Sequence, residues 1–201
     1  VYKNRGTSSP IYIIGIDAGG DPGDIMTRDV AVFNNQIYNT TPVSDTIYAI
    51  AARGDHTENV GIYHNTIHNI TGGLYLHYDM GDGSDNGVYF ANNIFDIPAG
   101  FPLITDENWV ITGTFTLSHN FFSHLPEAYT ETTMWTGDPA FVNAPANLRL
   151  SANSAAIDKA MPSTPPLTRD FDLALRYAPL DLGAFEYQPQ LMLYLPLITF
   201  E

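Results

Sequence analysis

The chain has 201 residues and a formal net charge of −14, from 22 acidic residues against 8 lysines and arginines. This balance argues against nucleic-acid binding, because contacts with phosphates need basic patches, and it disfavours anionic membranes on the same ground. The absence of cysteine excludes a disulfide framework and a thiolate metal site. No apolar run reaches the roughly 20 residues of a membrane span.

The chain begins at Val1 and carries no signal peptide. We therefore expect a processed form or a segment of a longer protein. The acidic, cysteine-free composition, rich in Thr, Asn and Gly, is typical of an extracellular or cell-surface protein in a medium that contains calcium.

Two kinds of short strand are predicted to alternate from residue 10 to about residue 126. The first kind covers 10–17, 45–53, 72–79 and 100–106, and the second lies within 29–40, 59–70, 86–97 and 113–125. Apolar and polar residues alternate in these segments with a period of two, which indicates strands with one buried face. Each repeat then holds two or three short strands joined by turns.

One asparagine stands at the same place in each segment of the second kind. The four are Asn35, Asn65, Asn92 and Asn120, at intervals of 30, 27 and 28 residues. Such a period predicts stacked structural repeats, and in a parallel β-helix equivalent residues of successive coils lie about 4.8 Å apart. An amide can satisfy unpaired backbone groups of a buried turn, so we expect a hydrogen-bonded ladder. The alternative is an antiparallel sandwich with short hairpin turns.

The strands of the first kind end in a column of charged residues, which are Asp17, Arg53, Asp79 and Asp106. Acid-rich turns follow, and like charges in neighbouring turns repel. Calcium, which takes about six to eight oxygen ligands, would relieve that repulsion. The spacing predicts calcium ligands at two sets of aspartates, Asp79, Asp82 and Asp85, and Asp17, Asp21 and Asp24. The alternatives are ion pairs of Arg53 with its acidic neighbours and a solvated acidic face.

The same column supplies the candidate catalytic residues, which are Arg53, His77, Asp79 and Asp106. His77 and Asp79 lie two positions apart and therefore on one side of their strand. A calcium site beside Arg53 would suit a polysaccharide lyase, whereas Asp79 with Asp106 would suit a glycoside hydrolase. Charges that only stabilise the edge of the stack are the alternative, so catalysis stays open.

Phe33, Tyr63 and Phe90 stand two residues before the aligned asparagines, on the outward side. Exposed aromatic columns mark contact with a ligand or a partner, and we predict that these three contact a glycan or another protein. Cover by the C-terminal segment is the alternative. A second outward column, three residues after the asparagines, holds Tyr38, His68, Phe95 and Ser123.

After about residue 126 the repeat fades into a different pattern. Its marks are Asp138–Pro139–Ala140–Phe141, Leu148 and Leu150, residues 154–158 (Ser-Ala-Ala-Ile-Asp), and residues 181–186 (Asp-Leu-Gly-Ala-Phe-Glu). This pattern resembles the C-terminal region of choice-of-anchor Q domain proteins, which are secreted right-handed parallel β-helix proteins. Ala155 stands where that group has proline. The resemblance implies a pectate-lyase-like fold and an exported, often surface-attached protein, and it implies no particular reaction.

We therefore predict an all-β chain, a right-handed parallel β-helix (solenoid) of about four regular coils with irregular C-terminal coils and a cap. Residues 1–126 are expected to form the regular coils, 127–187 the C-terminal coils and cap, and 188–201 an apolar tail. The tail either packs on its own domain or pairs with a partner as an added strand. Gly183 is expected to permit a close approach between chain segments.

The functional expectation is an exported structural or adhesive module that assembles into fibres or binds glycans. Its partners would be further copies of the chain, other surface proteins or glycans. The alternative is a polysaccharide lyase or glycoside hydrolase that acts on an extracellular polysaccharide. The sequence does not decide whether the chain is an enzyme.

Overall fold

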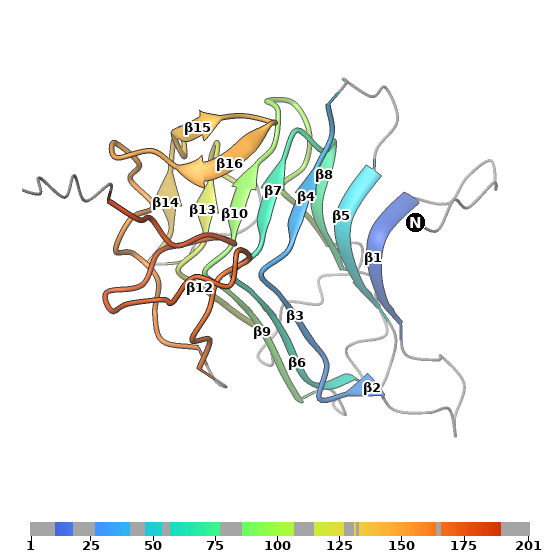
Figure 1. Cartoon of the computed structure of the whole chain (residues 1–201). Coiled ribbons are helices and arrows are strands. Elements are labelled where there is room, and N and C mark those ends of the chain that lie inside the picture. Colours follow the sequence, from blue (N-terminus) through green and yellow to red (C-terminus); the bar gives the residue numbers. More distant parts are fainter. Residues whose placement is uncertain are drawn as a thin grey trace, which may run out of the picture.

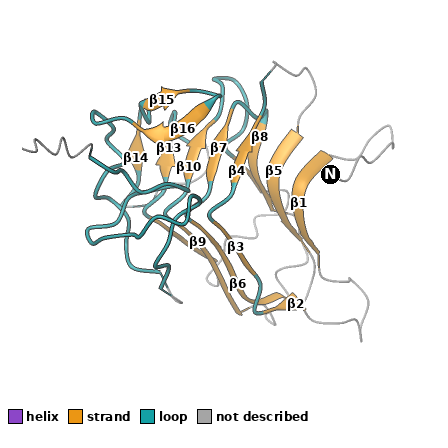
Figure 2. Ribbon diagram, viewed as in Figure 1, coloured by secondary structure: helices purple, strands orange, loops and turns teal. Residues whose placement is uncertain are grey.

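A computed structural model gives the arrangement of the chain (Figure 1). It describes residues 11–17, 27–40, 47–53, 57–76, 86–106, 115–126, 131, 133–163 and 166–189. Within these residues the chain is all-β, with sixteen strands and no helix (Figure 2). Accordingly, none of the described segments forms a helix with the length and hydropathy that crossing a bilayer requires.

Three parallel sheets contain the strands of the repeats. Sheet A has the order β1 (Ile11–Asp17), β5 (Ile47–Arg53), β8 (Gly72–Leu76) and β11 (Ile104–Asp106). Sheet B has the order β12 (Phe115–Ser118), β9 (Asn86–Ala91), β6 (Thr57–Tyr63) and β2 (Thr27–Arg28), with β3 (Ala31–Phe33) also paired to β6. Sheet C has the order β14 (Trp135–Thr136), β13 (Phe121–Phe122), β10 (Ile94–Asp96), β7 (Thr66–His68) and β4 (Gln36–Tyr38).

Each of the four repeats contributes to sheets A, B and C in turn, so neighbouring strands within a sheet come from successive repeats. The pairs between repeats are parallel in all three sheets. The parallel stacking predicted from the period is thereby confirmed, and the antiparallel sandwich is wrong for these strands.

One apolar core is filled by the inward side chains of the three sheets. Its fully buried members include Ile50, Ile62, Ile67, Leu74, Phe90 and Phe95. Each buried side chain of this size stabilises the fold by about 1.5–3 kcal/mol. In β7 only the middle residue, Ile67, belongs to this core, while Thr66 and His68 face the other side of sheet C. The period-two alternation therefore places polar side chains outside the stack.

The register corrects the predicted asparagine column at one position. Ile94 of β10 pairs with Thr66 of β7, which aligns Asn93 with Asn65, and the next pairing aligns Asn93 with Asn120. Asn92 therefore lies one residue before the column. The sequence offers two consecutive asparagines here, and the register is decided by Phe95, which must pair with Ile67 to reach the core. A slip of one residue exchanges the two faces of a strand, so it also moves the outward columns.

The C-terminal third departs from the repeats. Only β14 adds to sheet C, and β15 (Phe141–Asn143) pairs with β16 (Asn147–Leu150) as an antiparallel hairpin. Residues 154–163 and 166–187, here called the strap, then lie across the outer side of sheet C (Figure 1). A second core, with Ile94, Phe121 and Leu182 among its members, lies between sheet C and the C-terminal third. The sequence predicts irregular C-terminal coils and a cap after residue 126, and the described residues there mostly cover the stack from the side.

Candidate functional site

The asparagine ladder holds the repeats together at the corner between sheets B and C. The backbone N–H and the side-chain Nδ2 of Asn65 both donate to Oδ1 of Asn93, at 3.0 and 2.9 Å. Asn93 donates in the same way to Oδ1 of Asn120, at 3.0 Å for both bonds. Asn35 starts the ladder by donating to Asn65 from both nitrogens. Asn65, Asn93 and Asn120 are fully buried, so these bonds satisfy groups that water does not reach.

The ladder amides after Asn35 also bind the repeat before their own. Nδ2 of Asn65 donates to the carbonyl of Val32, and Nδ2 of Asn93 donates to the carbonyl of Ile62. The last rung is closed by a carboxylate, because Glu131 accepts from the backbone N–H of Asn120 at 2.8 Å. Burial raises the pKa of Glu131 from 4.5 to about 6, although its bonds to Asn120 lower it.

A column of left-handed residues stands immediately before the ladder. It holds Asn34, His64, Asn92 and His119, with φ between 52° and 59°. Asparagine tolerates this conformation, and histidine is also enriched there among residues with a Cβ. Sequence reasoning placed Asn92 in the ladder, and the structure places it here instead.

His64 is fully buried in this column. Its Nε2 accepts from Nδ2 of Asn92 at 3.0 Å. The amide orientation of Asn92 is fixed, because its Oδ1 accepts from the backbone N–H of Met161 at 3.0 Å. The neutral imidazole therefore carries its proton on Nδ1. Burial, and next the charge of Arg176, lower the pKa of His64 from 6.5 to about 3.

The strap fastens the left-handed column through a buried guanidinium. Arg176 donates to Oδ1 of Asn34 at 2.9 Å and to the carbonyl of Gly183 at 2.8 Å. It also forms an ion pair with Glu186 at 3.2 Å, with both side chains almost fully buried. Burial raises the pKa of Glu186. An unpaired charge at this depth would be costly, so the pair fixes where the strap lies.

Gly183 has φ 80° and lies against sheet C, where a Cβ would come within 2.5 Å of Oγ1 of Thr66. The predicted close approach at this glycine is confirmed. The same Thr66 hydroxyl accepts from the backbone N–H of Ala184 at 2.8 Å. Asp181 accepts from the backbone N–H of Asp158 at 2.7 Å. Asp158, Asp181 and Gly183, which belong to the C-terminal sequence pattern, are therefore among the anchors of the strap.

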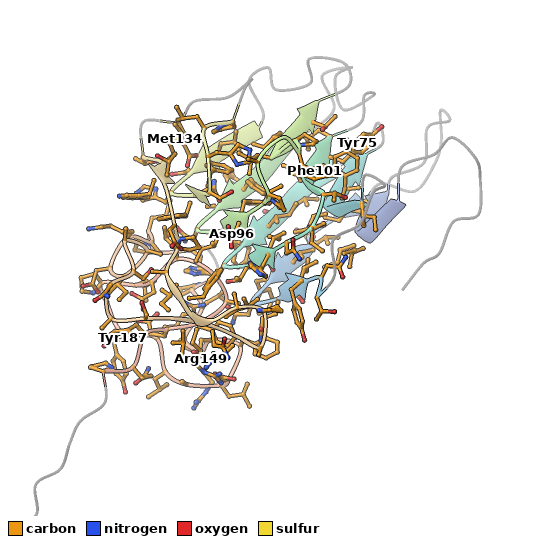
Figure 3. The ribbon with its side chains drawn as sticks, turned by 90° about the horizontal axis from the view of Figure 1, so that it is seen from above. Tyr75, Asp96, Phe101, Met134, Arg149 and Tyr187 are labelled. Carbon is orange, nitrogen blue, oxygen red and sulfur yellow. The ribbon has the colours of Figure 1, made fainter. Side chains whose placement is uncertain are left out.

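The candidate functional site is here called the Tyr38 surface. It consists of the outward column at the ends of β4, β7 and β10 (Tyr38, His68 and Asp96) together with Phe141 of β15. Tyr38 pairs with His68, and His68 pairs with Asp96. The sequence alignment put Phe95 in this column, but the corrected register makes Phe95 a core residue. Asp96 therefore occupies the outward position, and it is the labelled carboxylate in Figure 3.

His68 and Asp96 form a half-buried pair, with Nδ1 and Oδ2 2.7 Å apart. In the neutral tautomer Nδ1–H donates to the carboxylate, which leaves Nε2 as the nitrogen that can accept a proton. The ring of Phe141 packs edge-on against His68, with centroids 5.8 Å apart. Tyr38 is 48% exposed beside them. This surface joins an exposed ring, an oriented imidazole and a carboxylate, which is a combination that can hold polar ligands with an apolar face.

The predicted aromatic column Phe33, Tyr63 and Phe90 is only partly assembled. Phe33 is 42% exposed and stacks on Tyr63, with ring centroids 5.7 Å apart. Tyr63 is buried, and Phe90 is a core residue that pairs with Ile62. Phe90 as a glycan contact is therefore wrong, because the one-residue slip in the third repeat had put it on the outer face. Tyr89, which pairs with Gly61, is the exposed aromatic residue of that repeat.

The predicted charged column is partly confirmed at the level of backbone register. Asp17 pairs with Arg53. Asp106 pairs with Leu76, which itself pairs with Ala52, so Asp106 lies one position before Arg53. The predicted column is wrong at Asp106, because the pairing of Ile104 with Leu74 in the core decides the register of β11. The other predicted residues of the acidic edge lie outside the described residues; these are Asp21, Asp24, His77, Asp79, Asp82 and Asp85.

Within the described ranges, no group of three or more His, Asp or Glu side chains is arranged to hold a metal ion. The calcium prediction concerns aspartates whose side chains lie outside those ranges, and it stays a prediction.

Comparison with protein-family models, with curated proteins and with solved structures finds no match to this chain.

Proposed function

We propose that this chain is an exported structural or adhesive module, built as a right-handed parallel β-helix. The observation that supports the proposal is that the polar residues form hydrogen bonds and ion pairs within the structure. The ladder, the left-handed column and the strap use their amides, imidazole and buried charges to fix the repeats to one another. Such an arrangement produces a rigid scaffold, which is what an adhesive or fibre-forming protein needs. The right hand is inferred from the family resemblance and from the usual hand of parallel crossovers.

The Tyr38 surface supports glycan binding as a second candidate function. A sugar ring has an apolar face that packs on an aromatic side chain, and hydroxyl groups that bond to carboxylates and imidazoles. Tyr38 supplies the ring, and the pair of His68 and Asp96 supplies the polar partners.

The enzymatic alternative has less support from the Tyr38 surface. Glycoside hydrolysis uses two carboxyl groups, about 5–10 Å apart, on either side of the bond. Among the described residues Asp96 is the one carboxylate in contact with His68. The acidic edge could supply a catalytic group to an enzyme of this kind, so the test must include turnover.

The experiment combines a glycan array, a turnover assay on extracellular polysaccharides and electron microscopy of the purified chain. We expect fibres or glycan retention, with no release of reducing ends or unsaturated products. Tyr38→Ala should reduce glycan retention at least tenfold, while Tyr89→Ala on sheet B is the matched control that leaves it unchanged. Turnover that disappears in Asp96→Asn, Arg53→Ala or Asp79→Asn with the fold intact would instead establish an enzyme. Monomers with neither glycan binding nor turnover would contradict the proposal.

A further inference from the structure

A hairpin within the strap has its polar side buried and its apolar side exposed. Arg169 and Leu175 form an antiparallel bridge, and the turn between them is closed by Asp170, whose backbone N–H donates to the carbonyl of Ala174 at 2.9 Å. Asp170 and Arg176 are buried, at 4% and 8% exposure. The residues that alternate with them face solvent, yet most of them are apolar.

The outer side of the hairpin carries four large apolar residues. They are Phe171, Leu173, Leu175 and Tyr177, with exposures of 46%, 70%, 43% and 61%. Leu173 also has φ 66°, a conformation that a leucine rarely adopts. Clustered exposed apolar residues mark a surface that something covers.

The last described residues of the chain contact this hairpin. The ring of Phe171 packs against Phe185, with centroids 5.4 Å apart. The backbone N–H of Tyr177 donates to Glu186 at 3.1 Å. Tyr187, labelled in Figure 3, follows at once, and the described part of the chain ends two residues later, at Pro189.

The sequence after Pro189 is Gln-Leu-Met-Leu-Tyr-Leu-Pro-Leu-Ile-Thr-Phe-Glu. Eight of these twelve residues are Leu, Met, Tyr, Ile or Phe, and the only charge is on Glu201. Fully extended, they reach about 40 Å, which is ample to run along a hairpin of nine residues. We propose that residues 190–201 dock on the outer side of hairpin 169–177 of the same chain, against Phe171, Leu173, Leu175 and Tyr177. This inference does not depend on the proposed function.

The absence of cysteine makes a thiol-accessibility test specific. Leu175→Cys is prepared in the full chain and in a polar-tail version that also carries Leu193→Ser, Leu195→Ser and Leu197→Ser. We expect a maleimide to react with the cysteine at least tenfold faster in the polar-tail version. Tyr89→Cys, on sheet B, is the matched control and should react at one rate in both backgrounds. Equal rates for Leu175→Cys in both backgrounds would overturn the proposal.

Dilution of the Leu175→Cys protein with the natural tail sequence tests whether the tail that covers the hairpin belongs to the same chain or to a second copy. If the cysteine stays protected from the maleimide as the protein concentration falls, the tail belongs to the same chain. Protection that disappears on dilution, with a matching shift to the monomer in size-exclusion chromatography, would overturn the intramolecular assignment in favour of a second copy. Tyr177→Cys repeats both measurements if Leu175→Cys does not fold, as judged by circular dichroism.

Discussion

Glu131 closes the asparagine ladder by accepting, at 2.8 Å, the hydrogen bond that the backbone N–H of Asn120 would otherwise give to a further asparagine. Its second oxygen lies 3.5 Å from Nδ2 of Asn120. A carboxylate is suited to this place because it offers acceptors only, whereas an amide would bring a donor with no partner in a following repeat. The ladder therefore ends at this residue without an unsatisfied donor.

The closing role of Glu131 predicts a pH dependence of stability. Burial raises its pKa from 4.5 to about 6, so the folded chain binds a proton more readily than the unfolded chain. The contribution of Glu131 to the free energy of unfolding should therefore fall as pH rises from about 4.5 to 6, by about 1 kcal/mol once partial solvent screening is allowed for. Urea unfolding of the wild type and of Glu131→Gln across pH 4–7 measures this. The difference in free energy of unfolding between the two proteins separates this contribution from that of His64, and a difference that stays constant across the range would contradict the prediction.

Asn93 should matter more for stability than its neighbour Asn92. Asn93→Ala removes the acceptor of Asn65 and leaves the buried carbonyl of Ile62 and the Oδ1 of Asn120 short of donors. We expect a loss of at least about 3 kcal/mol, the cost of several buried unsatisfied groups. Asn92→Gly is the comparison, because glycine keeps the left-handed backbone; it removes the bonds to His64 and Met161 but leaves the ladder intact, so the loss should be smaller. Thermal unfolding that ranks the two in the opposite order would place the ladder at Asn92 after all.

The sequence was sufficient for the architecture of the repeats. The period, the apolar alternation and the recurring asparagine predicted parallel in-register strands, and sheets A, B and C have them. The prediction slipped by one residue in the third repeat, because Asn92 and Asn93 are both plausible rungs. Phe95 would have resolved the choice, since it has to align with Ile67 to be buried.

The position of the strap could not be predicted from the sequence, for a different reason. Arg176 binds Asn34 across 142 residues, and no local pattern specifies a contact at that separation. The sequence predicted the Tyr38 surface only in part. The one-residue error in the third repeat put Phe95 in the place of Asp96, so the pair of His68 with Asp96 was not predicted. Gly183 was correctly expected to allow a close approach, although its partner, Thr66, was not foreseen.

Gly183 and Gly100 form a matched pair for testing the strap. Both have positive φ, at 80° and 89°, but a Cβ at Gly100 would meet nothing within 4 Å. Gly100→Ala should cost about 1 kcal/mol from backbone strain alone. Gly183→Ala adds a clash with Thr66 and Ile94, so we expect a loss at least about 2 kcal/mol larger. Equal losses in thermal unfolding would mean that the strap does not seat on sheet C at Gly183.

His64 predicts an acid instability opposite in sign to the effect of Glu131. Its pKa is lowered to about 3 by burial and by Arg176, so below pH 6.5 the unfolded chain takes up a proton that the folded chain does not. The stability present above pH 6.5 should be lost as pH falls toward 3, by up to about 4 kcal/mol. His64→Asn keeps the left-handed backbone, as Asn34 and Asn92 do, and should flatten this slope. An unchanged acid transition in that variant would contradict the buried neutral imidazole.

The most direct test of the account is side-chain amide exchange measured by NMR, with the asparagines assigned. Asn65, Asn93 and Asn120 should show strongly protected Nδ2 protons, with cross-peaks between consecutive ladder residues. Exposed asparagines such as Asn143 and Asn153 should exchange at the rate of free amides. Free exchange at Asn93, or cross-peaks that link Asn92 rather than Asn93 to Asn65, would contradict the stacked arrangement on which the scaffold proposal depends.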